Sequence, residues 1–191
     1  MSARTPGRIR IVAGSRRGRL IRVPKGRGTR PTAEKVREAV FNALGSVTGL
    51  RALDLFAGTG AMGLEALSRG ARECVFVEED PVVAKILSEN VASLGFIAES
   101  RVINTGYQQA LTNLISAGSG FDLLFIDPPY RMLAEAEAVV TPLLSSLLSV
   151  EGLTVIEGDR AARVGFGGEP VFDRIYGDTR VVMVRMRRGD R

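Results

Sequence analysis

Short apolar runs alternate with amphipathic stretches along most of this chain, and that alternation restricts its fold more than any other feature. The apolar runs have the length of buried strands, and the stretches between them space their apolar residues as a helix does. Strands that alternate with helices favour an open, mostly parallel sheet with helices on both faces. We therefore expect an α/β fold whose ligands bind at the carboxyl ends of the strands.

The expected elements follow one another without an internal repeat. Strands are expected at 52–56, 74–77, 101–104, 121–126 and 152–157. Helices are expected at 32–44, 81–94, 107–116 and 133–147, and another is opened by a turn at 58–63 and runs to about residue 68. Two further alternating segments, 171–176 and 180–187, predict an antiparallel pair that closes the sheet. The predicted sheet thus has seven strands, and the last strand in the chain is antiparallel.

Positive charge is concentrated in the first 30 residues. They hold nine Arg, one Lys and no acidic residue, which gives a charge of +10, whereas residues 31–191 hold 16 basic and 21 acidic residues, which gives −5. Alternating charge and hydrophobicity at 8–13 and 19–23, around a turn at 14–18, predicts a β-hairpin. We expect a basic hairpin arm over 1–30 and a body over 31–191. The arm is either a solvated cationic tail or, in our preferred interpretation, a nucleic-acid contact surface.

Missing residue types also narrow the chemistry. One cysteine, Cys74, and no histidine exclude an internal disulfide, a cysteine zinc cluster and Ser-His-Asp or Cys-His catalysis. No run approaches the roughly 18 apolar residues of a membrane span, and the first 30 residues lack the apolar core of a secretory signal. We therefore expect a cytoplasmic protein with no metal and no membrane partner.

A glycine-rich loop joins the first predicted strand of the body to the next helix. Gly58, Gly60 and Gly63 form the pattern G-x-G-x-x-G, in which glycine lets the backbone turn tightly and approach a ligand. Glu78 ends the next strand, where a carboxylate can bind both hydroxyls of a ribose. Three alternatives remain: a dinucleotide, S-adenosylmethionine (SAM), or a turn that only packs helix on strand. Asp54 favours SAM, because SAM carries an ammonium group and no phosphate.

Three parts of the chain resemble a known family in order and spacing. Residues 54–60 resemble the first motif of class I SAM-dependent methyltransferases, and Asp127-Pro128-Pro129-Tyr130 resembles their fourth motif in enzymes that methylate exocyclic amino groups. Residues 14–20, 29–32, 37–38 and 41–42 are similar to the N-terminal signature of the RsmD family, which are bacterial 16S rRNA guanine-N2 methyltransferases. The resemblance implies a Rossmann-like class I methyltransferase domain with a small N-terminal β-hairpin extension.

The same resemblance implies roles for individual residues. The implied cofactor-binding residues are Asp54, Phe56, Gly58, Gly60, Glu78, Asn104, Thr105 and Gly106, with Asp54 near the ammonium and residues 104–106 near the adenine. Either Glu78 or its neighbour Glu79 is implied to bind the ribose hydroxyls, and the position of Glu78 at the strand end favours Glu78. The implied catalytic residues, which face the target base, are Asp127, Pro128 and Tyr130. The implied RNA-binding residues are Arg16, Arg17, Arg19 and Arg30.

The fourth motif has a chemical rationale of its own. The exocyclic amine of guanine is a poor nucleophile, because its lone pair is delocalised into the ring, so it needs acceptors at its N–H groups. Asp127 offers a carboxylate, and Pro128 offers a carbonyl in a loop that two prolines stiffen. Tyr130 can stack on the base. Transfer from an activated methyl group then needs no histidine base, only proximity, orientation and charge stabilisation.

The expected reaction is methyl transfer from SAM to the exocyclic N2 of a specific guanine in 16S rRNA. The expected partner is 16S rRNA in an assembling small ribosomal subunit, with contacts to ribosomal proteins left open, and the enzyme is expected to act as a monomer. Asp-Pro-Pro-Tyr does not separate guanine N2 from adenine N6, since both are exocyclic amines. The alternatives are therefore a DNA or other amino-methyltransferase, a non-catalytic RNA-binding module, or an NAD(P)-linked oxidoreductase of the same fold.

Overall fold

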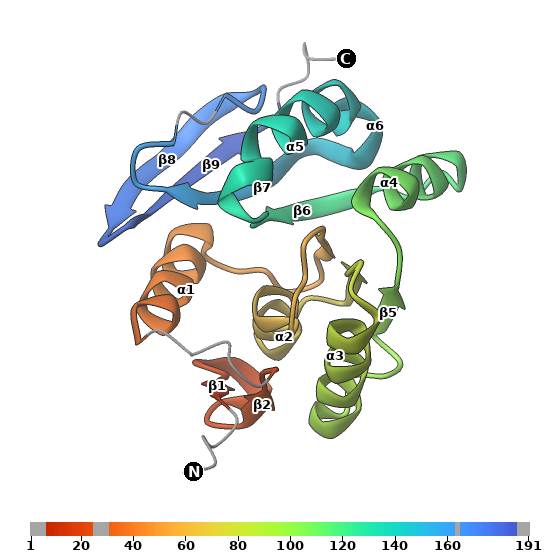
Figure 1. The fold of residues 1–191 in the computed structure, drawn as a ribbon, viewed down its shortest axis with the longest axis vertical. Helices are drawn as coiled ribbons and strands as arrows, with labels where there is room; N and C mark the ends of the chain where they lie inside the picture. Colours follow the sequence, from red (N-terminus) through yellow and green to blue (C-terminus); the bar gives the residue numbers. More distant parts are fainter. Residues whose placement is uncertain (1–6, 25–30, 163–164, 187–191) are drawn as a thin grey trace.

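A seven-stranded sheet forms the centre of the protein, described by a computed structural model over residues 7–24, 31–162 and 165–186. Its strands are β3 (Arg51–Asp54), β4 (Glu73–Val77), β5 (Ser100–Ile103), β6 (Phe121–Ile126), β7 (Leu148–Asp159), β8 (Glu169–Tyr176) and β9 (Thr179–Arg185). They lie in the order β5-β4-β3-β6-β7-β9-β8, and β9 runs antiparallel to both of its neighbours (Figure 1). The predicted fold class is confirmed.

Helices precede and connect the parallel strands. They are α1 (Pro31–Leu44), α2 (Ala61–Ser68), α3 (Pro81–Leu94), α4 (Tyr107–Ser116), α5 (Leu133–Val140) and α6 (Leu144–Leu147), with the 3₁₀ turns η2 (Tyr130–Met132) and η3 (Thr141–Leu143). The capping residues of α3 show why its bounds were predictable. Asp80 accepts hydrogen bonds from the N–H groups of Val82 and Val83, and Gly95 ends the helix at φ +74°.

Three predicted boundaries are wrong. The helix expected over 133–147 is interrupted by η3, because Pro142 lacks the N–H group that an uninterrupted α-helix needs there. The first strand of the body ends at Asp54 rather than at residue 56, since the backbone turns there into the glycine loop. The strand expected over 152–157 is longer at both ends and runs from Leu148 to Asp159.

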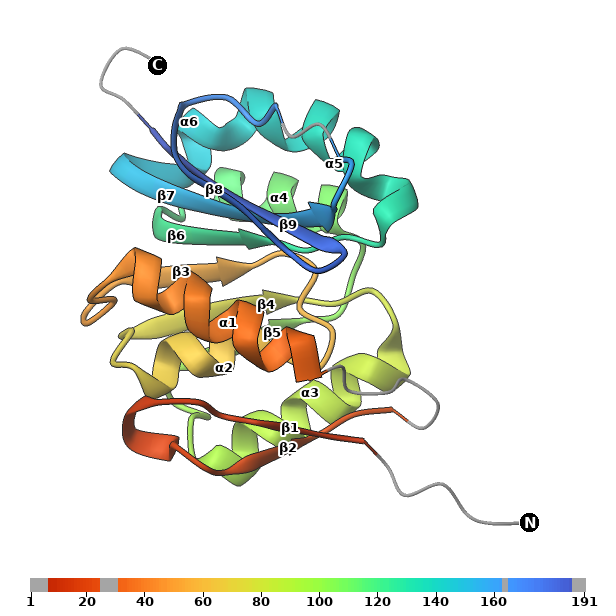
Figure 2. The same ribbon diagram turned by 90° about the vertical axis from the view of Figure 1, so that its left-hand side faces the viewer.

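Alternate residues of the strands face two separate apolar clusters. In β6, Leu123 and Phe125 join a cluster that also contains side chains of α1, α2 and α3, whereas Leu124 and Ile126 join a cluster with side chains of α4, α5 and α6. This division follows from the two-residue period of a strand. The protein is therefore a three-layer α/β/α sandwich, with helices on both faces of the sheet (Figures 1 and 2).

The strand order reverses beside β3. The chain passes outward from β3 to β4 and β5, then returns to β6 on the other side of β3 and continues to β7. The connections on the two sides leave the sheet in opposite directions at this point. Open sheets bind ligands at the carboxyl ends of the strands at such a reversal. The β3–β6 boundary therefore locates the candidate site.

The N-terminal segment forms the predicted hairpin. Strands β1 (Arg8–Arg10) and β2 (Leu20–Arg22) pair antiparallel around the turn η1 (Gly14–Arg16). Ile11 and Ile21 are fully buried in the cluster that contains α1, α2 and α3. Figure 2 shows the hairpin lying across these helices. The division into an arm over 1–30 and a body over 31–191 stays a prediction, but the hairpin shares the body's core.

Buried polar contacts attach the hairpin to α2. The side chain of Glu65, which is fully buried, accepts hydrogen bonds from the backbone N–H groups of Val12 (2.8 Å) and Ala13 (2.9 Å). The same carboxylate is paired with Arg69 (2.8 Å) and Arg37 (3.5 Å). Two donors and two cations compensate its buried charge, so the hairpin and the helices depend on one another for the stability of this contact.

None of the helices within the described ranges is long and apolar enough to cross a membrane.

Candidate functional site

Four carboxylate side chains gather at the carboxyl ends of the central strands. Asp54 ends β3, Glu78 follows β4, Asp127 follows β6, and Glu157 lies near the end of β7. Asp54, Asp127 and Glu157 are two residues beyond Ala52, Phe125 and Val155, which belong to the cluster on the α1–α3 face. The three acids therefore point to the same face of the sheet. Sequence reasoning brought three of the four together and missed Glu157.

The glycine loop is closed by hydrogen bonds to two of these acids. The N–H group of Gly58 donates to Oε2 of Glu78 (2.8 Å), and the N–H group of Gly63 donates to Oδ2 of Asp54 (3.0 Å). Gly60 precedes α2 at φ +86°, and a Cβ atom there would lie 2.4 Å from Leu87. Glycine is required at Gly60 for both its backbone angle and its surroundings. The loop backbone is thereby held across the top of β3 and β4.

Asp54 lies inside the protein, with only 3% of its surface exposed. Burial is the main cause that raises the pKa of Asp54 to about 7, and the negative charge of Glu78 raises it further. The hydrogen bond from the N–H group of Gly63 opposes these effects. A buried carboxylate beside a glycine-rich loop, ionised only at a cost in free energy, is a candidate for holding a cationic group.

The second predicted edge of the cofactor site lies after β4 and β5. The side-chain amide of Asn104 donates to the backbone carbonyls of Glu78 (2.8 Å) and Glu79 (3.1 Å) and so joins the two strand ends. Thr105 and Gly106 follow, and Gly106 directly precedes α4. The Glu79 side chain is exposed, whereas Glu78 is half-buried.

Phe56 closes the opposite side of this edge. Its half-buried ring packs on Tyr107, with ring centroids 4.9 Å apart. Tyr107 begins α4, so the contact joins the end of the first motif to the helix after β5. All eight predicted cofactor-binding residues therefore line one continuous edge of the sheet.

The residues of this edge fit SAM. Glu78 can accept both hydroxyls of a ribose, and Asp54 can offset an ammonium. A pyrophosphate at the start of α2 would lie beside the acids Asp54 and Glu78, which already accept hydrogen bonds from the N–H groups of Gly63 and Gly58. Carboxylates around the loop instead match a ligand that carries positive charge.

The Asp-Pro-Pro-Tyr segment leaves the sheet beside this edge. Asp127 directly follows β6, Pro128 is buried, and Tyr130 begins η2 with 49% of its surface exposed. An exposed ring at the end of a stiff, partly buried loop is available to stack on a flat ligand. The three predicted catalytic residues thus lie next to the predicted cofactor edge, at the reversal of strand order.

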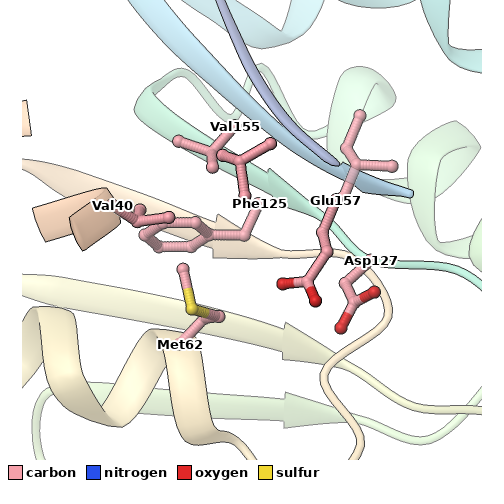
Figure 3. Close-up of a pocket in the computed structure, with 8 residues that line it drawn as sticks. Val40, Met62, Phe125, Asp127, Val155 and Glu157 are labelled. Carbon is pink, nitrogen blue, oxygen red and sulfur yellow. The ribbon is translucent and has the colours of Figure 1, made fainter. Parts of the chain in front are cut away.

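Glu157 is the acid that the sequence analysis did not assign. Figure 3 shows its carboxylate beside that of Asp127, with Val40, Met62, Phe125 and Val155 to one side. Desolvation by the surrounding protein atoms raises the pKa of Asp127 well above its usual range, and the charges of Glu157 and Asp54 raise it further. Asp127 keeps a solvent-accessible surface all the same. Glu157 ends the strand predicted over 152–157, and that position was the signal that could have identified it.

The predicted RNA-binding arginines differ in how free they are. Arg16 donates through Nε to the carbonyl of Leu94 (2.6 Å) and lies over the ring of Phe96, 5.0 Å from its centroid. Arg19 is exposed and donates to the carbonyl of Ser93 (2.9 Å). Arg17 is exposed, and no partner of its side chain occurs among the residues that the structure describes. Arg30 lies outside the described residues.

The hairpin turn lies far from the acids. Arg16 contacts Ser68 and Leu94, where α2 and α3 end, and these helices run antiparallel to the strands they follow. Figure 2 shows η1 at the end of the molecule opposite the tips of β3 and β4. The turn is therefore docked on the ends of α2 and α3 through Arg16, while Arg17 stays exposed to water. The open end of the hairpin, with Arg8 and Arg22, lies nearer the carboxyl ends of the strands.

Asn90 joins the hairpin to the glycine loop. This buried side chain of α3 accepts from the N–H group of Arg22 (2.8 Å) and donates to the carbonyls of Arg22 (3.0 Å) and Thr59 (3.0 Å). Sequence reasoning missed it, because one asparagine within an amphipathic helix carries no pattern. In the described part of the chain, no group of three or more Cys, Asp or Glu side chains could hold a metal ion.

Known proteins resemble this chain over most of its length. The profile of a family described as "Conserved hypothetical protein 95" matches residues 9–184. Ribosomal RNA small subunit methyltransferase D of Escherichia coli (strain K12) is 38% identical over 154 residues, which cover 80% of this chain and 76% of the relative. The match to the family profile spans the hairpin turn, the glycine loop and the Asp-Pro-Pro-Tyr segment.

Solved structures share the fold. The Escherichia coli protein YhhF superposes with a TM-score of 0.80 at 32% identity, over 95% of this chain and 99% of the other. An RNA methyltransferase from Salinibacter ruber, solved with S-adenosyl-L-homocysteine, has a TM-score of 0.63 at 18% identity, over 83% of this chain and 95% of the other. The second similarity concerns the fold alone.

Proposed function

Since this chain belongs to the RsmD family of methyltransferases, we propose that it transfers a methyl group from SAM to the exocyclic N2 of a guanine in 16S rRNA. The observation that carries the proposal is the position of Asp127-Pro128-Pro129-Tyr130. This segment lies beside the glycine loop at the reversal of strand order. Target base and methyl donor would therefore meet at one edge of the sheet.

The cofactor would be held by the residues around the glycine loop. SAM supplies a methyl group that its sulfonium has already activated for transfer. Asp54 would offset the ammonium group, and Glu78 would accept the ribose hydroxyls while it also orders the loop through the N–H group of Gly58. Asn104, Thr105 and Gly106 would border the adenine, and Phe56, packed on Tyr107, would close the edge.

The target amine would be oriented by the Asp-Pro-Pro-Tyr segment. Asp127 would accept one N–H group of the guanine amine, and the carbonyl of Pro128 would accept the other, which aims the nitrogen lone pair at the methyl carbon. Negative charge at Asp127 also stabilises the positive charge that develops on the nitrogen. One carbon–nitrogen bond forms, one carbon–sulfur bond breaks, and the nitrogen loses a proton to Asp127 or water. The exposed Tyr130 would stack on the base.

RNA would approach along the hairpin. Arg8, Arg10, Arg17, Arg19 and Arg22 are all exposed on its two strands and turn, and Arg suits phosphate contacts. Arg22 also pairs with Glu89 on α3. We place the substrate in an assembling small subunit in the cytoplasm, with contacts to ribosomal proteins, and the enzyme acts as a single chain.

The test uses the full chain and small ribosomal subunits that lack the modification. Incubation with SAM labelled in its methyl group should label 16S rRNA at one nucleotide, and nucleoside mass spectrometry should identify N2-methylguanine. Calorimetry should detect SAM binding and no NADH binding. Label in N6-methyladenine would contradict the guanine assignment, and absence of label with these subunits would contradict the proposed function.

A further inference from the structure

Glu157 has no role in the reaction as described so far, although it lies at the centre of the site. Parallel pairing of β6 with β7 aligns Phe125 with Val155 and Ile126 with Ile156, so the register continues to Asp127 and Glu157. Both side chains line the same hollow, and Figure 3 shows their carboxylates next to each other. Two acceptors are therefore presented side by side.

Neither carboxylate has a hydrogen-bond donor among the residues that the structure describes. By comparison, Glu65, Asp54 and Glu78 each accept at least one hydrogen bond from the chain. Neighbouring carboxylates repel one another, so the doubly ionised pair becomes favourable only when donors reach both groups. Burial raises the pKa of Glu157, and the positive charge of Arg37 only partly opposes that effect. The two unused acceptors point to a ligand with two adjacent donors.

Guanine has such a pair of donors. Its N2 amine and its N1–H group are neighbours on the Watson–Crick edge, whereas adenine has an N6 amine next to N1, which is an acceptor. A carboxylate facing N1 would bind guanine and repel adenine. We propose that Glu157 accepts a hydrogen bond from N1–H of the target base and thereby selects guanine over other bases with an exocyclic amine. This inference rests on the proposed function and adds to it the residue that identifies the base.

The surroundings of the two acids agree with a base rather than a small ion. Apolar side chains of Val40, Met62, Phe125 and Val155 line the hollow to one side of both carboxylates. The exposed ring of Tyr130 follows the same loop as Asp127. An exposed ring three residues from Asp127, together with two aligned acceptors, suits a flat heterocycle with donors along one edge.

The test compares two target bases that differ at N1. Small subunits are reconstituted with 16S rRNA that carries either guanine or 2-aminopurine at the mapped target nucleotide. The second base keeps the N2 amine but has an acceptor at N1. Methyl transfer to each is measured for the natural enzyme and for Glu157→Gln, whose amide can donate to N1. Glu151→Gln, exposed near the other end of β7, is the control. SAM affinity of each variant, measured by calorimetry, reports folding separately from activity.

The natural enzyme and Glu151→Gln should prefer guanine over 2-aminopurine in kcat/KM by at least about tenfold. Glu157→Gln should bind SAM normally and lose at least about tenfold of that preference, through lower activity on guanine and retained or higher activity on 2-aminopurine. An unchanged preference in Glu157→Gln would overturn the role of Glu157 alone. No transfer by the natural enzyme to guanine-containing subunits would instead contradict the proposed function.

Discussion

Asp54 illustrates the conflict between function and stability at a single side chain. Burial raises the pKa of its carboxyl group to about 7 in the folded protein, against 3.8 for an ordinary aspartate. The folded state therefore binds the proton more tightly, and stability contributed by the protonated form is lost as the pH rises from about 4 to about 7. The ionised form of Asp54 lowers the stability of the folded protein, and a bound cationic ligand would compensate its charge.

Replacing this carboxyl group should separate the two effects. Asp54→Asn should raise the free energy of unfolding at pH 8 by about 1–3 kcal/mol, since no buried charge remains. SAM affinity should fall by at least about tenfold. In the natural protein, SAM affinity should weaken as the pH drops below 7, and this dependence should be smaller in the variant. Urea unfolding and calorimetry at pH 5–8 measure both. Unchanged SAM affinity in Asp54→Asn would contradict its assignment to the ammonium.

Asp127 should affect transfer and leave cofactor binding intact. Asp127→Ala removes the acceptor at the target amine, so methyl transfer to small subunits should fall by at least about a hundredfold while SAM affinity stays within about twofold. Because the pKa of Asp127 is raised, activity of the natural enzyme should increase with pH. The midpoint of this increase should lie above about 4, where an ordinary carboxyl group titrates. Substantial turnover by Asp127→Ala would refute the assigned role.

The hairpin and the helices form one unit because of close backbone contacts. Gly14 adopts φ +82°, and a Cβ atom there would lie 1.8 Å from the backbone oxygen of Ser68, which ends α2. Ser68 also donates through its hydroxyl to the carbonyl of Ala13 (2.5 Å) and accepts from the N–H group of Arg16 (3.0 Å). The turn therefore fits against α2 only with glycine at this position.

Gly18 provides a matched control for Gly14. It has nearly the same φ, +83°, but no atom within 4 Å of an added Cβ. Gly18→Ala should cost about 1 kcal/mol for its backbone angle alone, whereas Gly14→Ala should in addition displace the hairpin from α2. Hydrogen exchange of the Val12 and Ala13 amides, which donate to Glu65, should accelerate strongly only in Gly14→Ala. Equal exchange in both variants would show that the contact with α2 does not hold the hairpin.

At the scale of the whole molecule, the two ends of the hairpin lie at different distances from the carboxylates of the site. The carboxylates lie at the carboxyl ends of the strands, and the docked turn lies at the opposite end of the molecule. Exposed arginines occur at both ends of the hairpin. Binding of an RNA whose target base reaches Asp127 should therefore depend most on the arginines at the open end of the hairpin. Arg8 is at that end, and Arg17 is in the turn.

Single charge removals at the two ends test this direction. Arg8→Gln should weaken binding to small subunits by about threefold to tenfold and reduce the slope of log affinity against log salt by about one. Arg17→Gln should have a smaller effect on both. SAM affinity should not change in either variant. A larger effect at Arg17 would show that the RNA engages the turn first.

Most elements could be predicted because the signals that define them are local. The alternating strands, the α4 bounds and the α3 bounds follow from periodicity and from caps such as Asp80 and Gly95. The break at Pro142 was foreseeable from the missing N–H group. The hydrogen bonds from Val12 and Ala13 to Glu65, and from Asn90 to Thr59, were not, since these partners lie at least 31 residues away in the chain.

The amino-acid sequence was sufficient to determine the fold class, the glycine loop and the Asp-Pro-Pro-Tyr segment, because each depends on residues close together in the chain. Only the tertiary structure decided that Glu157 lies beside Asp127 and that the basic turn docks on α2 and α3. Strand order and helix packing arise from contacts between distant segments, and no local pattern records which strand ends become neighbours. The residue that we propose to distinguish guanine is visible only once β7 lies next to β6.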